Sequence, residues 1–308
     1  MPVISFVALR VLRIVPIAFG VVTIIFLIFK AVPGDQATLM VGATATQAEI
    51  DAMRVRLGLD RPILEQYVSH MFGLVQGDFG WSSTFRGNPL PYILARLPAT
   101  LALMLSAIAL TIVIGVPAGV VAAVHHDRWI DHLLTGFVVA LLAVPNFWLG
   151  LMLVAVLAVQ MGWLPSHGFE GPASLIMPTL ALAARLIALV ARMTRGVMLE
   201  ELRKDYVRTA RAKGLEGRTI VVRHVLRNAM IPTVTVIGLQ MGYLLGGSTV
   251  VERIFAWPGV GDLLLNAIGM RDYTLVQGIV VVYVAGFMLI NLVVEGLYLL
   301  INPRLRHA

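Results

Sequence analysis

The chain has 308 residues, of which 58% are hydrophobic and only 13% are charged, and its mean hydropathy is +0.86. Because a soluble domain carries roughly a quarter charged residues, this composition excludes an ordinary soluble globular protein and a disordered chain, and it is typical of a polytopic membrane protein. The net charge of +7 is concentrated in one loop, which favours a topological role over nucleic-acid binding, and the lack of Cys excludes disulfides and thiol chemistry.

Six apolar runs approach or exceed the roughly 20 residues that a tilted helix needs to cross a bilayer. Helices satisfy their own backbone in lipid, and the runs lack the alternation of a β-barrel, so an all-α fold with six transmembrane helices is predicted. Phe29 is unsuited to a signal-peptidase site ending at Ala31, so the first run is expected to remain uncleaved. The expected spans are about 9–32, 100–124, 133–161, 175–191, 231–251 and 278–301.

The distribution of Lys and Arg over the short loops sets the expected topology. Most of these residues lie in the N-terminus, the loop between the second and third spans, the loop between the fourth and fifth spans, and the tail. The positive-inside rule therefore places both termini in the cytoplasm. The expected parts are an N-terminal helix (1–32), an extracytoplasmic segment (33–99), a transmembrane core (100–301) with a cytoplasmic loop (192–229), and a cytoplasmic tail (302–308).

The segment 33–99 carries signals for two short amphipathic helices. Thr46 followed by Glu49 predicts a capping box, and Gly58 is suited to end the helix. Asp60 and Pro62 are expected in the cap and first turn of the second helix, and Gly77 at its end. Both helices are expected to lie on the outer membrane surface or to cover the pore mouth.

Motifs for covalent or metal chemistry are missing from the sequence. No Lys follows a Gly, which excludes a phosphate loop of the ATPase type, and no His-Glu-x-x-His occurs. Three histidines lie near two acids in the loop between the second and third spans, where a solvated polar turn is favoured over a metal site. These residues are His125, His126, Asp127, Asp131 and His132.

Polar residues inside the predicted spans are candidates for a translocation pathway, with hydrogen bonding between helices as the open alternative. The candidates are Asn146, Gln160, Gln240 and Asn291. Arg185 is expected to reach the cytoplasmic interface, with pairing inside the bundle as the alternative. Glu295, near the end of the last span, is expected to anchor the helix rather than to couple protons.

The loop 192–229 carries ten basic residues and is long for a connection between helices. The spacing of Ala and basic residues from Tyr206 to Lys213 predicts a short helix, and Gly214 can supply its left-handed C-terminal residue. Fewer basic residues would set the topology, so docking of a soluble partner is favoured over a purely topological role.

The loop 192–229 and seven further elements in the expected order resemble the permease subunits of type I ABC importers, in the group that imports dipeptides, oligopeptides and nickel. The strongest is Asp205-Tyr-Val-Arg-Thr-Ala-Arg-Ala-Lys-Gly-Leu215, which matches the coupling motif of that group. Departures are Arg227, where the group frequently has Pro, and Glu295 and Asn302, where Asp is common. The other elements are Val32–Asp35, Gly58–Pro62, Gly77–Gly80, Gly162–Pro165, Glu252–Gly259 and Arg271–Tyr273, and Asn302–Arg304 completes the series.

This resemblance implies a transport subunit, not an enzyme, in the cytoplasmic membrane of a prokaryote. Its implied partners are a second homologous permease, two ATPase subunits and an extracytoplasmic binding protein, and it implies that ATP and Mg²⁺ are bound by the partners and no cofactor by this chain. The coupling residues implied are Asp205, Tyr206, Arg208, Thr209, Ala210, Arg211, Ala212, Lys213, Gly214 and Leu215. The residues expected to contact the binding protein are Asp60, Arg61, Trp257, Pro258, Gly259, Arg271 and Asp272.

Substrate and mechanism leave alternatives open at this point. Small peptides are favoured, with nickel or haem uptake by the same architecture as the alternative. A proton-coupled secondary transporter would need an ionisable residue deep in the bundle, and a membrane enzyme would need a convergent nucleophile or metal set. Near the outer mouth, Pro258 with Gly259 and Gly261 is compatible with a re-entrant turn and with a plain loop.

Overall fold

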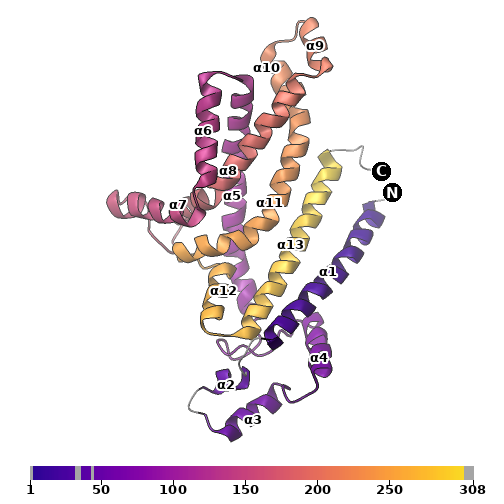
Figure 1. Ribbon diagram of the computed structural model, residues 1–308, viewed down its shortest axis with the longest axis vertical. Coiled ribbons are helices and arrows are strands. Elements are labelled where there is room, and N and C mark those ends of the chain that lie inside the picture. Colours follow the sequence, from indigo (N-terminus) through magenta and orange to yellow (C-terminus); the bar gives the residue numbers. More distant parts are fainter. Residues whose placement is uncertain (1–2, 32–35, 43–44, 302–308) are drawn as a thin grey trace. The chain divides into compact units, whose positions relative to one another are not determined.

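The computed structural model describes residues 3–31, 36–42 and 45–301 (Figure 1). Helices form the regular structure of this part, which otherwise contains one isolated β-bridge between Ser82 and Gly87. The helices are α1 (Val3–Ala31), α2 (Gln36–Val41), α3 (Gln47–Arg56), α4 (Ile63–Val75), α5 (Leu90–Val124), α6 (Trp129–Ala143), α7 (Asn146–Leu153), α8 (Pro172–Leu202), α9 (Asp205–Ala212), α10 (Gly217–Thr219), α11 (Leu226–Ile254), α12 (Val260–Gly269) and α13 (Tyr273–Ile301). Two π-helical stretches, Val154–Gln160 and Ile220–Val225, follow α7 and α10.

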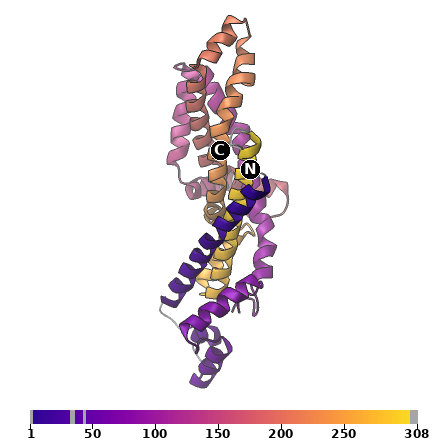
Figure 2. The same ribbon diagram turned by 90° about the vertical axis from the view of Figure 1, so that its right-hand side faces the viewer.

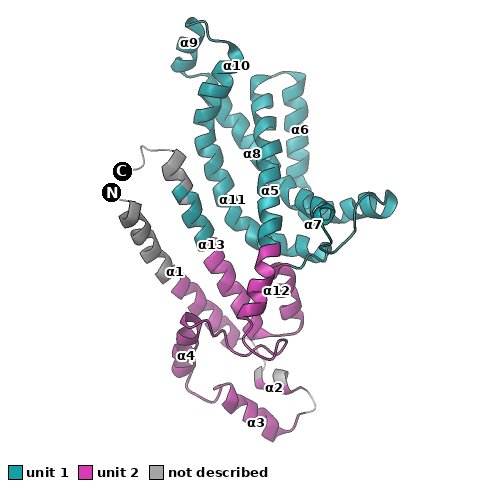
Figure 3. Ribbon diagram, turned by 180° about the vertical axis from the view of Figure 1, so that it is seen from behind, with its two compact units in different colours: residues 1, 100–258, 289–308 teal, residues 2–99, 259–288 magenta. Residues whose placement is uncertain are grey.

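The chain divides into two compact units (Figure 3). Unit 1 contains residues 100–258 and 289–308, and unit 2 contains residues 2–99 and 259–288. The extracytoplasmic segment expected at 33–99 therefore belongs to the same unit as α1, α12 and the first half of α13.

The described residues contain four helices that are long and apolar enough to cross a membrane. A fifth span results if the bent pair α6 and α7 with its π-helical continuation is counted as one. The apolar stretch Pro16–Ala31 of α1 and the helix α12 are shorter. The four long helices are Leu90–Val124, Pro172–Leu202, Gly217–Ile254 and Tyr273–Val294.

The third span, expected over 133–161, is not a single continuous helix. The two helical parts meet at 99° around Val144 and Pro145. Val144 has extended backbone (φ −82°, ψ 123°), because the ring of a following Pro disfavours the helical conformation. Hydropathy does not reveal this break, because Val144 and Pro145 do not interrupt the apolar run.

The boundaries of the loop 192–229 also need correction. Helix α8 continues to Leu202, eleven residues beyond the predicted end of the span. The helical stretch that contains the next span begins at Gly217, after the short helix α9. The apolar run ends at the first Arg, but a helix can continue through polar residues of good helix propensity. Figures 1 and 2 show the result within unit 1: α9 lies at the far end of the hairpin formed by α8 and α11, beyond the ends of α5 and α6.

Close contact between α5 and α8 depends on two glycines one turn apart. A Cβ at Gly115 would lie 3.0 Å from the carbonyl oxygen of Ile187, and a Cβ at Gly119 would lie 2.5 Å from that of Ala191. This is the small-xxx-small arrangement that lets membrane helices approach closely. The core of unit 1 therefore rests on backbone-to-backbone packing against the Ala-rich face of α8.

The outer helices are capped largely as predicted. Thr46 and Glu49 form the capping box of α3. Gly58 (φ +66°) and Gly77 (φ +79°) occupy the left-handed positions after α3 and α4. Asp60, however, is not the cap of α4, which begins after Pro62; the side-chain amide of Gln66 donates hydrogen bonds to the carbonyl oxygens of Leu59 (3.2 Å) and Arg61 (2.7 Å) instead.

Candidate coupling site

Helix α9 has the form that the sequence predicts, with bounds that differ by one residue. It runs from Asp205 to Ala212, and Gly214 follows in the left-handed conformation (φ +76°). The amide of Gly214 donates to the carbonyl of Arg211 (2.9 Å), and that of Leu215 to the carbonyl of Ala210 (3.2 Å). These two bonds are the Schellman motif, which satisfies carbonyls at a helix end.

The two faces of α9 have different surroundings. Val207 and Ala210 are buried, and they pack with Met198 of α8, Ile220 and Val225. The remaining side of the helix and its C-terminal turn are exposed: Asp205, Arg208, Thr209, Arg211, Ala212, Lys213, Gly214 and Leu215. This short helix is therefore held by one face, and its other face is exposed and carries basic side chains.

A buried acid, Glu201, connects α8 to α9. Its side chain accepts a hydrogen bond from the Tyr206 hydroxyl (2.7 Å) and forms an ion pair with Lys204, and the residue is 8% exposed. Burial, followed by the bond to Glu201, raises the pKa of the Tyr206 phenol above its ordinary value. One carboxylate oxygen is thus engaged by Lys204 in the two-residue turn and the other by Tyr206 in the first turn of α9, which fixes the angle between the helices. Sequence reasoning missed this role of Glu201, because nothing local distinguishes it from its neighbour Glu200.

A second ion pair links α6 to α8 on the side toward α9. Arg195 donates to both oxygens of Asp131, from Nε at 2.6 Å and from a terminal nitrogen at 2.7 Å, and Asp131 is 1% exposed. The backbone amide of Asp127 (3.1 Å) and the hydroxyl of Thr135 (3.3 Å) also donate to this carboxylate. A two-pronged pair of this kind fixes orientation as well as distance.

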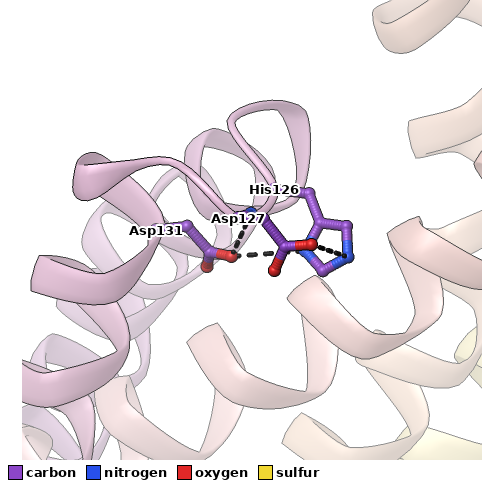
Figure 4. A group of neighbouring side chains, drawn as sticks. All are labelled: His126, Asp127 and Asp131. Carbon is purple, nitrogen blue, oxygen red and sulfur yellow. Dashed lines mark hydrogen bonds and ion pairs between the residues drawn. The ribbon is translucent and has the colours of Figure 1, made fainter.

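The polar cluster of the α5–α6 turn is arranged around the same carboxylate (Figure 4). Potential ligand atoms of His126, Asp127 and Asp131 lie within 4.8 Å of one another. Because Arg195 occupies both oxygens of Asp131, a cation would have to displace a guanidinium there. The geometry is that of a polar turn held by an ion pair.

The four pathway candidates do not converge in one described cavity. Asn146 is half-buried at the start of α7, just after the break, and Gln160 is exposed at the end of the π-helical stretch. Gln240 and Asn291 are half-buried on α11 and α13. A cleft of about 480 Å³ between α8 and α11 is lined by Arg192, Glu200, Glu201 and apolar residues, and by none of the four. Arg185 is exposed on α8, and the side chain of Glu295 lies outside the described residues.

The residues expected to contact a binding protein separate into exposed and buried groups. Asp60, Arg61 and Arg271 are exposed, and Pro258 is half-buried. Trp257 is 0% exposed and stacks edge-on against Phe169, and Gly259 is buried as the N-cap of α12. The expectation that Trp257 and Gly259 offer contact surface is therefore wrong, since both are covered by the chain itself.

Asp272 is likewise covered, at 1% exposure, and its two oxygens organise unit 2. One oxygen accepts from the hydroxyl of Ser82 (2.6 Å) and the amide of Thr84 (2.9 Å), and the other accepts from the amide of Leu275 (3.0 Å) in the first turn of α13. Asp272 thus caps α13 and holds the loop of Ser82, and it is not a surface contact residue. Glu252, buried on α11, similarly accepts hydrogen bonds from Thr100 and Ser248, each at 2.9 Å.

Comparisons with known proteins agree over nearly the whole chain. Residues 115–307 match the family "binding-protein-dependent transport system inner membrane component", and residues 3–104 match the N-terminal family of the same system. The glutathione transport system permease protein GsiC of Escherichia coli (strain K12) is 42% identical over 303 residues, which are 98% of this chain and 99% of that protein. GsiC of Shigella dysenteriae serotype 1 matches to the same extent.

A solved structure shows the same fold. The chain is similar to a chain of the inward-facing MetNI methionine ABC transporter, with a TM-score of 0.59 and 21% identity, over 70% of this chain and 99% of that one. The family excludes the alternatives of a proton-coupled transporter and a membrane enzyme. The chain belongs to the inner membrane components of binding-protein-dependent transport systems, and it is a multi-pass permease subunit of an ABC importer.

Proposed function

We propose that this permease imports small peptides, with glutathione as the first substrate to test. The observation that supports this substrate class is the 42% identity, over almost the full length, to permeases named for glutathione transport. Nickel and haem are the alternatives, and the described residues supply no histidine cluster in a span that would favour a bare metal ion.

The proposed assembly contains a second homologous permease, two ATPase subunits that bind ATP and Mg²⁺, and an extracytoplasmic binding protein. Both chain termini and α9 lie in the cytoplasm, as the distribution of basic residues favours. The exposed residues Asp60, Arg61 and Arg271 are the proposed contacts for the binding protein, and the half-buried Pro258 is a further candidate.

The proposed coupling site is the exposed face of α9 with Gly214 and Leu215. Arg208, Arg211 and Lys213 supply charge-assisted contacts to a groove on one ATPase subunit. When ATP closes the ATPase pair, α9 moves with its groove, and the bonds of Glu201 to Tyr206 and Lys204 transmit this movement to α8. The ion pair between Asp131 and Arg195 connects α8 to α6, so that α6 moves together with α8 and α9. The permease thus converts differential nucleotide binding by its partner into a change between two packings of the helices.

One experiment tests the assembly and the substrate together. The chain is affinity-purified in mild detergent from its native membrane, and the copurifying complex is reconstituted in liposomes and supplied with the binding protein. We expect two ATPase subunits and a second permease to copurify, and ATP-dependent uptake of labelled glutathione or of a dipeptide. Copurification with uptake of nickel or haem but no peptide would overturn the substrate, and purification of the chain alone would overturn the coupling site.

A further inference from the structure

Helix α4 has an uncovered apolar face. Five of its large apolar side chains are exposed: Ile63, and a set of four that are exposed by 71% at Leu64, 56% at Val68, 67% at Phe72 and 88% at Val75. Their spacing of four, four and three residues places them on one side of the helix, and they are called the α4 stripe here. Water-exposed surfaces rarely carry such a contiguous row of large apolar groups.

The other side of α4 is fixed to α1, within unit 2. The hydroxyls of Tyr67 and Thr23 are hydrogen-bonded at 2.7 Å, and the Tyr67 ring packs edge-on against Phe26 with centroids 5.4 Å apart. The His70 ring lies 5.7 Å from the same Phe26 ring. Thr23 precedes the end of α1 at Ala31 by about 12 Å at the rise of an α-helix. Helix α4 therefore contacts α1 about two turns before the C-terminal end of α1, alongside its apolar part and not past its end.

The surroundings of the α4 stripe match the boundary of a membrane. A groove of about 660 Å³ runs along Leu64, Val68 and Phe72, with Arg61, Glu65, Gln76 and Asp78 among its polar lining residues. Lys30, at the end of α1, is hydrogen-bonded to Gln66, and basic residues at such positions direct their charge toward the headgroups. On α1 itself, Ile17, Ile24 and Ile28 are more than half exposed, so both helices present apolar surface.

The neighbouring helix α3 lacks this pattern. Its ten residues include acidic and basic side chains along its length, none of its residues is buried, and its one strongly exposed large apolar side chain is Val55. Both outer helices are expected on the membrane surface or over the pore mouth. Of the two, only α4 has an exposed apolar face of the kind that a membrane surface would cover.

We propose that α4, but not α3, is embedded in the interfacial region of the nearer leaflet, with the α4 stripe among lipid acyl chains. Helix α1, to which α4 is attached, also exposes large apolar side chains, and apolar helices with polar residues at their margins bind at the boundary of headgroups and acyl chains. Lipid, rather than a protein partner, then fixes the outer segment. This assignment goes beyond the proposed function and is independent of the substrate.

The lack of native Cys makes a direct test possible. Val68→Cys and Phe72→Cys are labelled with a nitroxide in the assembled transporter, in nanodiscs of phosphatidylethanolamine and phosphatidylglycerol. Collisions with oxygen, which concentrates among acyl chains, are compared with collisions with a water-soluble nickel chelate. We expect a several-fold higher ratio of oxygen to nickel accessibility at both sites than at Asp51→Cys on α3, and a ratio approaching that of Ile24→Cys on α1.

Two results would overturn the proposal. High nickel accessibility at both sites would show that water covers the α4 stripe. Low accessibility to both reagents would show that protein covers it, and repeating the measurement with and without the binding protein identifies whether that protein or the second permease is responsible. Only variants that keep the ATPase rate of the unmodified transporter are compared, and Leu64→Cys provides a third site if one of them fails to assemble.

Discussion

Single residues decide how α9 is held and what it can meet. Gly214 is required for its positive φ, which costs other residues about 1 kcal/mol or more. Within the described residues, nothing lies within 4 Å of a Cβ built at this position. The space beyond it is therefore open to a partner. A glycine can be needed here for its positive φ or for this open space, and experiment can separate the two reasons.

Gly214→Asn and Gly214→Ala form the matched pair for this separation. Asn tolerates the left-handed conformation and Ala does so poorly, so Asn should keep α9 intact. We expect both variants to lose coupled uptake in liposomes while ATP hydrolysis continues. Either side chain would prevent the groove of the ATPase subunit from approaching the backbone at position 214. Normal uptake by the Asn variant would mean that the glycine serves only its backbone conformation.

Tyr206→Phe removes a hydrogen bond to a buried carboxylate. The loss of a hydrogen bond to a charged group costs about 1.5–3 kcal/mol, so α9 should loosen from α8. We expect fewer substrate molecules imported per ATP hydrolysed, and a similar loss for Glu201→Gln. Tyr243→Phe, at a tyrosine that is 76% exposed on α11, is the control. An unchanged ratio in Tyr206→Phe would show that the apolar contacts of Val207 and Ala210 suffice.

At the scale of elements, the packing of α5 on α8 tolerates no side chain at Gly119. The built Cβ lies 2.5 Å from a backbone oxygen of α8, and backbone cannot move aside as a flexible side chain can. We expect Gly119→Ala to lower the thermal stability of the detergent-solubilised complex markedly, by the 1–3 kcal/mol typical of overpacking or more. Gly136→Ala, where nothing lies within 4 Å, should leave it unchanged. Equal stability of the two variants would contradict the packing.

The ion pair between α6 and α8 should behave as a buried pair. Arg195→Lys cannot reproduce the two-pronged geometry, and Asp131→Asn removes the charge. Loss of one partner of a buried pair costs up to about 3–5 kcal/mol, lessened here because the Arg195 side chain is 28% exposed. We expect a clear fall in unfolding temperature for each single variant and a non-additive double variant. Asp51→Asn, in the exposed pair with Arg54, should have little effect.

At the scale of the whole molecule, the proposed coupling site contributes basic side chains to the net charge of +7. The exposed basic groups of α9 are surface charges, so their attraction to a partner is screened by salt. We expect release of the ATPase subunits to increase with ionic strength, and Arg211→Glu with Lys213→Glu to cause release at low salt. Arg211→Glu alone is compared with Arg128→Glu, a single charge reversal in the α5–α6 turn, as the charge-matched control. Salt-independent association would show that apolar contacts hold the partner.

The sequence by itself determined the all-α membrane class, the permease family, and the position and cap of α9. These features depend on local signals: long apolar runs, a glycine with positive φ, and contiguous motifs. The break at Pro145 and the extension of α8 to Leu202 follow from local preferences that hydropathy alone does not detect. The tertiary structure decided the burial of Trp257 and Asp272. It also selected Glu201 as the partner of Tyr206, and it paired Arg195 with Asp131 across 64 residues and Ser82 with Asp272 across 190. Such choices depend on which groups folding brings together and removes from water, and no local pattern records them.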